Sequence, residues 1–165
     1  MTTVRRITID DAQLLREVRL RALSDTPLAF GSTHAREFCF DDSEWQRRAT
    51  RAATSDDGAM FLAIDNLSCC GLIGCFAEED VPGQACIVSM WVAPEYRRRG
   101  IGAKLMLTAE TWARKQGFRE LCLDVTEGNQ AAITLYQRCG FWLTGEFDRY
   151  PNHPNLRELF MLKRI

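Results

Sequence analysis

The stretch from Ala85 to Lys104 constrains the fold more than any other part of the chain. It reads ACIVSMWV followed by APEYRRRGIGAK. The first eight residues are nearly all apolar, which predicts a central strand buried on both faces. The residues that follow Gly100 place Ile101, Leu105 and Trp112 at helical spacing. A buried strand that leads through a glycine-bearing turn into an amphipathic helix is typical of a mixed α/β layer.

The rest of the chain extends this pattern. Apolar or alternating runs predict strands at 4–9, 60–64, 71–77, 85–92 and 120–125, and two more within 141–150 and 157–165. Helices are predicted after Asp10 and Asp11, from about Asp42 or Ser43, after Gly100, and over 129–139. The first half of the sheet is therefore expected to be mostly antiparallel, with a βαβ crossover around 92–125. The length suits one domain over 1–165, and no linker or repeat interrupts it.

Composition excludes several classes of protein. Lys and Arg total 21 against 22 Asp and Glu, so the basic balance of a nucleic-acid-binding protein is absent. No apolar run reaches the roughly 18 residues of a membrane span, and the first residues lack the apolar stretch of a secretory signal. Seven cysteines without a CxxC motif, several of them in apolar runs, are expected to be reduced and to pack as small apolar residues. With two histidines, no metal site is expected, and we predict a reduced cytoplasmic protein.

The turn after the apolar strand has the features of an anion site. Backbone N–H groups in the first turn of a helix have no partner, and the helix dipole favours negative charge there. Gly100 and Gly102 have no Cβ, so a phosphate can approach the main chain, and Arg97, Arg98 and Arg99 add donors. The spacing is neither the GxGxxG of dinucleotide-binding folds nor the GxxxxGK[ST] of nucleotide P-loops. The alternative is a solvated basic turn in which the glycines only provide flexibility.

A second segment, VTEGNQAAITLYQRCGF, follows the next predicted strand. Asn129 either caps a helix or directs its amide toward a ligand. Tyr136 lies two helical turns further along the same face. Taken alone, Tyr136 is also consistent with a core aromatic residue whose hydroxyl reaches the surface.

Together the two segments resemble the GNAT superfamily of acyl-CoA-dependent N-acyltransferases. The first resembles the family's pyrophosphate motif, [Gln/Arg]-x-x-Gly-x-[Gly/Ala], and the second its N-x-x-A-x-x-L-Y-x-x-x-G-F element. The resemblance implies a central, mostly antiparallel sheet of about seven strands with a splayed pair and four flanking helices. It also implies acetyl-coenzyme A as cofactor. The residues that the resemblance places at the cofactor are Met90, Trp91, Val92, Arg97, Arg98, Arg99, Gly100, Ile101, Gly102, Ala103, Asn129, Ala132, Tyr136 and Arg138.

The resemblance further implies direct attack of an amine on the thioester. Tyr136 matches the general acid that protonates the departing thiolate. The base is less well defined. Glu78 is the favoured candidate, and Glu79 beside it and Asp124, on the strand that leads to Asn129, are alternatives. Each is also consistent with an ordinary surface carboxylate. No cysteine stands in a pattern that indicates a nucleophile.

Acidic and aromatic residues point to a small cationic acceptor. Glu79, Asp80, Asp124 and Trp142 are the predicted substrate contacts, and further acids gather at Glu37, Asp41, Asp42, Glu146 and Asp148. These acids are equally consistent with a solvated surface. The most specific expectation is an aminoglycoside or other amino sugar, by analogy with the fold. The alternatives are a protein Nα-acetyltransferase and a non-catalytic acyl-CoA sensor. Exposed final strands could pair in a homodimer.

Overall fold

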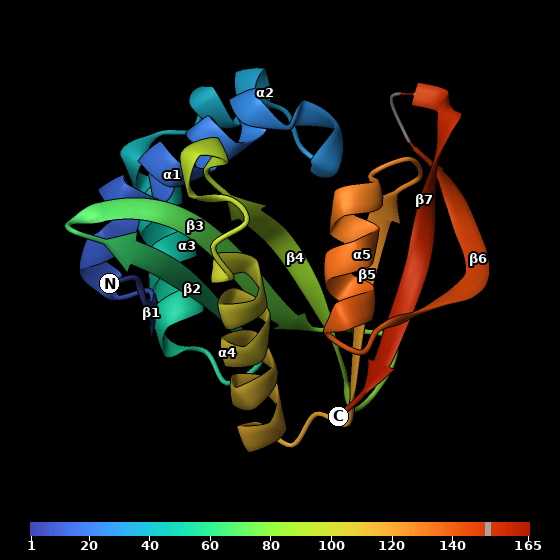
Figure 1. Cartoon of the computed structure of the whole chain (residues 1–165). Coiled ribbons are helices and arrows are strands. Elements are labelled where there is room, and N and C mark those ends of the chain that lie inside the picture. The colour runs from blue at the N-terminus through green and yellow to red at the C-terminus, as the bar shows by residue number, and fades with distance from the viewer. Residues whose placement is uncertain (151–152) are drawn as a thin grey trace.

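The computed structural model describes residues 1–150 and 153–165. Seven strands form one sheet in the order β1-β2-β3-β4-β5-β7-β6 (Figure 1). All neighbouring strands are antiparallel except β4 and β5, which run parallel. The strands are β1 (Thr3–Arg6), β2 (Gly58–Asp65), β3 (Ser68–Ala77), β4 (Gln84–Val92), β5 (Glu120–Thr126), β6 (Trp142–Tyr150) and β7 (His153–Arg164).

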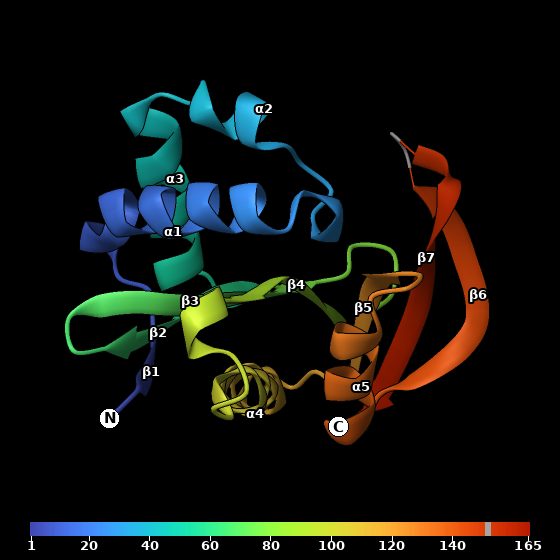
Figure 2. The ribbon, with the colours of Figure 1, turned by 45° about the horizontal axis from the view of Figure 1, so that its top comes forward.

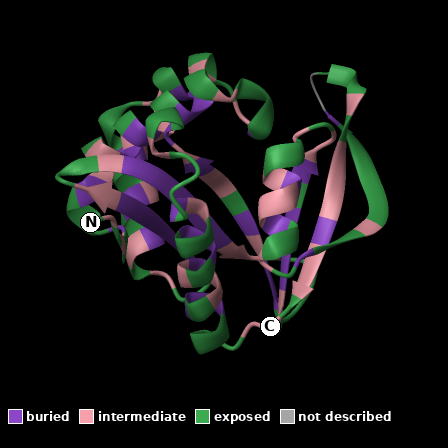
Figure 3. Cartoon of the chain, viewed as in Figure 1, coloured by how far each residue is buried: buried purple, intermediate pink, exposed green. Residues whose placement is uncertain are grey.

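Helices cover both faces of this sheet. They are α1 (Ala12–Asp25), α2 (His34–Phe38), α3 (Asp42–Thr54), α4 (Ile101–Lys115) and α5 (Gln130–Arg138). Figure 2 shows α1 and α3 on one side of the first four strands and α4 on the other. Each side has its own apolar cluster: Leu15 and Trp45 belong to the first, Leu105 and Trp112 to the second. Figure 3 shows buried residues on both sides of the sheet. The helices α1, α3, α4 and α5 are therefore held by burial of one apolar face each.

The parallel pair β4 and β5 separates soon after it forms. The two strands are in register only from Gln84 to Cys86 and from Glu120 to Cys122, although each continues further. A β-bulge contributes to this divergence, since β4 has one residue more than β3 between Val88 and Trp91. Ser89, inside the bulge, has a positive φ of 57°. Bulges bend and twist a strand, so β4 turns away from β5 (Figure 1).

The predicted element order and mixed α/β class are confirmed. The structure adds the five-residue helix α2, which is too short to show a clear period in the sequence. The first strand is also shorter than predicted: it ends at Arg6, because Ile9 to Asp11 form a 3₁₀ turn whose Asp11 carboxylate accepts bonds from Thr8.

The prediction that every cysteine is reduced is wrong for one pair. Cys86 and Cys122 form a disulfide between β4 and β5. They stand directly opposite one another at the last paired position of the two strands. Their separation of 36 residues gives no sequence signal, because the pairing depends on strand register.

Candidate active site

The turn between β4 and α4 exposes a run of free main-chain donors. None of the N–H groups from Arg98 to Ala103 donates to a backbone acceptor among residues 1–150 and 153–165. Arg98 and Gly100 have positive φ angles of 63° and 77°. Such alternation of backbone conformation directs successive N–H groups toward one point, and α4 begins immediately afterwards. The turn is therefore an open cradle of unpaired donors, which is the geometry that the predicted anion site requires.

The three arginines of this turn have different surroundings. Arg97 donates from Nε to the carbonyl of Val92 at 2.9 Å and forms an ion pair with Asp25, so its guanidinium holds the turn against β4 and α1. Arg99 lies 5.3 Å from the centre of the Tyr96 ring. Arg98 and Arg99 are exposed and make no ion pair within the described part of the chain. These two side chains are the ones free to approach an anion.

The structure shows a packing role for Gly102 beside the phosphate approach that the sequence predicts. A Cβ at this position would lie 3.0 Å from Leu135 Cδ2 and 3.1 Å from Met90 Cε. The missing side chain thus lets α4 pack closely on α5 and β4. Gly100, by contrast, has open space around it and is favoured by its positive φ.

A cavity of about 510 Å³ opens where β4 and β5 separate. Its lining comprises Arg19, Ala29, Phe30, Gly31, Ser32, Arg36, Glu37, Arg48, Cys86, Ile87, Val88, Ser89, Met90, Asp124, Val125, Thr126, Asn129, Ala132, Tyr136 and Glu158. The structure therefore brings together five of the predicted site residues: Met90, Asp124, Asn129, Ala132 and Tyr136. The predicted residues Glu78, Glu79, Asp80, Trp91, Val92, Arg138 and Trp142 do not line it.

Asn129, the N-cap of α5, and Tyr136, within α5, both line this cavity. Asn129 caps α5, and its Oδ1 accepts a hydrogen bond from the Ala132 N–H at 3.2 Å. Tyr136 is 8% exposed, and burial raises the pKa of its hydroxyl well above the usual range. This hydroxyl therefore stays protonated at neutral pH and can act as a proton donor.

Carboxylates form the strand-side wall of the cavity. Burial and the nearby charges of Asp148 and Glu78 raise the pKa of Asp124. Burial and the charges of Asp124 and Asp148 likewise raise the pKa of Glu158. Neither Asp124 nor Glu158 has a side-chain hydrogen bond or ion pair with any residue that the structure describes. Both carboxylates thus have a raised affinity for a proton or a cation.

Basic residues form the opposite wall, and no sequence motif points to them. Arg19 donates from Nε and Nη2 to the two carboxylate oxygens of Glu37 at 2.9 and 2.8 Å, and from Nη1 to Ser89 Oγ at 2.8 Å. Arg48 Nη1 lies 3.7 Å from the same Glu37. Glu37 is 1% exposed, so it is a buried partner of arginines and is not free to bind an acceptor.

The segment after α1 closes part of the cavity. Thr126 Oγ1, at the end of β5, donates to the carbonyl of Leu28 at 2.7 Å. The Tyr150 hydroxyl, at the end of β6, donates to the carbonyl of Phe30. Because these bonds connect the strands to residues 28–30, they restrict access to the cavity from that side.

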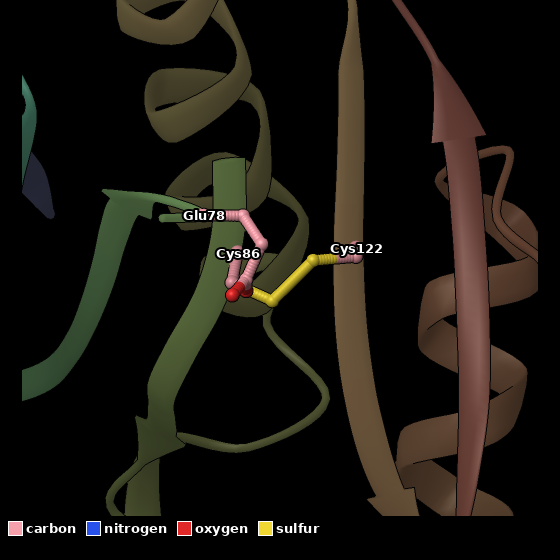
Figure 4. Close-up of side chains that lie close together, drawn as sticks. All are labelled: Glu78, Cys86 and Cys122. Carbon is pink, nitrogen blue, oxygen red and sulfur yellow. A yellow bond between two sulfur atoms is a disulfide. The ribbon is translucent and has the colours of Figure 1, made fainter. Parts of the chain in front are cut away.

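Glu78 lies beside the disulfide rather than in the cavity lining. Its carboxylate oxygen and the sulfurs of Cys86 and Cys122 lie within 4.8 Å of one another (Figure 4). With the two sulfurs joined in a disulfide, no thiolate is left to act as a metal ligand. Trp142 lies on β6 and is 43% exposed.

No helix within the described residues combines the length and apolar character that a membrane crossing requires.

Comparison with known proteins identifies the family. The model of the acetyltransferase (GNAT) family matches residues 20–141. The probable N-acetyltransferase camello of Xenopus tropicalis is 31% identical over 87 residues, which are 53% of this chain and 40% of that protein. The aminoglycoside N(6')-acetyltransferase type 1 of Klebsiella aerogenes is 36% identical over 67 residues, or 40% of this chain and 44% of that one. The chain thus matches less than half the length of these curated relatives.

A solved structure matches over the full length. The GNAT-family acetyltransferase from Streptococcus pneumoniae is 25% identical, with a TM-score of 0.84, over 100% of this chain and 99% of that one. The separated parallel strands and the donor-rich turn agree with this similarity. The chain belongs to the GNAT family of acetyltransferases.

Proposed function

We propose that the protein transfers the acetyl group of acetyl-coenzyme A to a primary amine of a small molecule bound between β4 and β5. One observation carries the proposal: the free N–H groups of Arg98 to Ala103 adjoin the cavity that contains Tyr136 and Asp124. Met90 connects the two, since it lines the cavity and packs against Gly102. A diphosphate at the turn and a reacting group in the cavity could therefore belong to one bound molecule.

The residues at the turn fit a diphosphate. Unpaired donors at a helix N-terminus bind phosphate oxygens well. The amides from Arg98 to Ala103 would hold the diphosphate, and Asn129 would contact the chain that extends from it, because its side-chain N–H groups have no partner in the described structure. Arg138, in the last turn of α5, is exposed and remains a proposed contact at the phosphate end.

Acetyl-coenzyme A supplies the activated acetyl group as a thioester. An alkylammonium ion cannot attack it until a base removes a proton. We assign that role to Asp124, whose raised pKa favours proton acceptance and which lines the cavity. Glu78, the favoured candidate from sequence, acts through its charge, which helps raise the pKa of Asp124.

The other two roles also fall to residues around the cavity. Beyond Cys86, β4 has no partner strand on its β5 side, so main-chain N–H groups near Met90 are available to stabilise negative charge on the acyl oxygen. Trp91 and Val92 continue this edge and are proposed to contribute through their main chain. The protonated hydroxyl of Tyr136 is the donor for the departing sulfur.

The size of the cavity favours a small acceptor. Its volume of about 510 Å³ must hold the end of the cofactor as well as the amine. The bonds from Thr126 and Tyr150 to residues 28–30 restrict the open groove that a peptide terminus would need. An aminoglycoside is a second candidate acceptor, because one relative carries that name. Glu79, Asp80 and Trp142 are proposed to contact only an acceptor that extends beyond the cavity.

Two measurements test the proposal. Isothermal titration should show coenzyme A binding, and a thiol-release assay with amino sugars, polyamines, amino acids and N-terminal peptides should show turnover. Ala103→Pro removes one donor in the first helical turn, where proline is tolerated, and should weaken coenzyme A binding about tenfold. Gln13→Pro, an exposed first-turn position of α1, is the matched control and should leave binding unchanged. Binding without turnover of any amine would indicate a sensor instead of an enzyme.

A further inference from the structure

The cavity between β4 and β5 has two walls of opposite charge. Arg19, Arg36 and Arg48 line it from α1, α2 and α3, while Asp124 and Glu158 line it from β5 and β7. Figure 1 places α1 and α2 on one side of β4, and β5 with β7 on the other. A ligand in the cavity is therefore exposed to a basic wall and to an acidic wall at the same time.

The basic wall has more donors than its own carboxylates use. Each of the three side-chain nitrogens of Arg19 already donates to Glu37 or Ser89. Arg48 donates from Nε to Glu44 at 2.7 Å, which leaves its outer nitrogens only a 3.7 Å contact with Glu37. Arg36 lines the cavity, yet its side chain makes no hydrogen bond or ion pair with any described residue.

This arrangement leaves positive charge for a ligand. Three guanidinium groups line the cavity, and the one buried carboxylate there, that of Glu37, contacts only those of Arg19 and Arg48. Glu44 is shared with Arg47 outside the cavity. Arg36 thus offers an uncompensated charge and up to five N–H donors in a planar fork that suits a carboxylate.

The acidic wall lacks a cation of its own. Asp124 and Glu158 make no ion pair in the part of the chain that the structure describes, and the charge of Asp124 helps to raise the pKa of Glu158. Asp124 is exposed and Glu158 is half-buried. Like charges repel, so a cation between the two carboxylates is favoured. The ammonium group of an acceptor amine would supply that cation.

We propose that the acceptor is a small zwitterion, an amino acid or close analogue, with its amine at Asp124 and Glu158 and its carboxylate at Arg36. This inference rests on the proposed acetyl transfer and narrows it to one substrate class. A polycation would leave Arg36 unpaired and would bring further positive charge to the basic wall, which costs binding free energy.

Matched ligands test the need for the carboxylate. Proteinogenic amino acids are compared with their carboxamides and with their decarboxylated amines. Thiol release gives KM, and titration into protein saturated with coenzyme A gives Kd without requiring turnover. We expect loss of the carboxylate to raise both constants about tenfold or more, because a hydrogen-bonded charge pair is lost.

Two variants locate the effect. Arg36→Gln, on an exposed side chain whose loss should not disturb folding, is expected to weaken the amino acid about tenfold and leave its carboxamide unchanged. Arg47→Gln removes a charge from α3 outside the cavity and should preserve the preference for the carboxylate.

The outcomes separate the two proposals. If carboxamides, polyamines or aminoglycosides are turned over as well as amino acids or better, the proposal of a zwitterionic acceptor is refuted. The proposed acetyl transfer is not refuted by that result. The same carboxylate preference in Arg36→Gln as in the unmodified protein would also overturn the zwitterionic acceptor. Binding of amino acids without turnover of any amine would support the zwitterion site and refute acetyl transfer.

Discussion

Replacing Glu37 by Gln should destabilise the protein more than any other single change of one carboxylate to an amide on the helical side. Glu37 is 1% exposed, and both of its oxygens accept bonds from Arg19, whose side chain is 11% exposed. Loss of one partner of a buried ion pair costs about 3–5 kcal/mol. Because glutamine keeps one acceptor, we expect the lower end, about 3 kcal/mol. For a chain of this size that lowers Tm by about 6–12 °C.

Urea and thermal unfolding measure this cost. Glu44→Gln is the control, because Glu44 also pairs with two arginines, Arg47 and Arg48, but is 25% exposed and should cost less than about 1 kcal/mol. Burial alone would raise the pKa of Glu37, but the bonds and charge of Arg19 lower it overall. The stabilisation that the Glu37 carboxylate provides is therefore complete above the pKa of this group in the unfolded chain. It is lost as pH falls through the lower pKa that the group has in the folded protein. The reasoning would be refuted if Glu37→Gln lost less than about 1 kcal/mol of unfolding free energy. It would also be refuted if the difference in unfolding free energy between the unmodified protein and Glu37→Gln stayed the same at acidic pH.

Three further predictions concern the site. Tyr136→Phe should lower turnover about 100-fold and leave the Kd for coenzyme A within about twofold, measured by thiol release and titration; an unchanged rate would assign Tyr136 to packing alone. Gly102→Val should cost about 1–3 kcal/mol in urea unfolding and weaken coenzyme A binding, because its side chain would displace Leu135 and Met90; unchanged affinity would argue against the turn as the cofactor site. Asp124→Asn should lower kcat/KM about 100-fold. In a pH-rate profile it should also remove the rise of rate with pH that deprotonation of Asp124 produces. If the variant keeps that rise, the base is another group.

The turn with the free N–H groups, which is the proposed cofactor end of the site, was largely predictable because it is built from local geometry. A buried strand, a turn with Gly100 and a helix follow one another within about 20 residues, so the direction of the free N–H groups depends little on the rest of the chain. The cap at Asn129 and the position of Tyr136 two turns later are likewise consequences of helical periodicity.

The acceptor end was not predictable, because it depends on tertiary packing. Glu37 looked like one of several acids available to a substrate, yet packing of α2 on α1 buries it against Arg19. Arg36 belongs to no sequence motif. It becomes a candidate site residue only because the position of α2 places it in the lining of the cavity. The disulfide was not predicted for a related reason, because the pairing of Cys86 with Cys122 depends on the register of two parallel strands.

The bulge in β4 joins these two ends of the site. Ser89 takes a left-handed conformation there, and its Oγ accepts a hydrogen bond from Arg19 at 2.8 Å. The next residue, Met90, packs against Gly102 at the start of α4. One extra residue in a strand therefore fixes the basic wall relative to the phosphate cradle. In the proposed acetyl transfer the amine must meet the acyl carbon at a set distance from that cradle, so the bulge would help to position the two substrates.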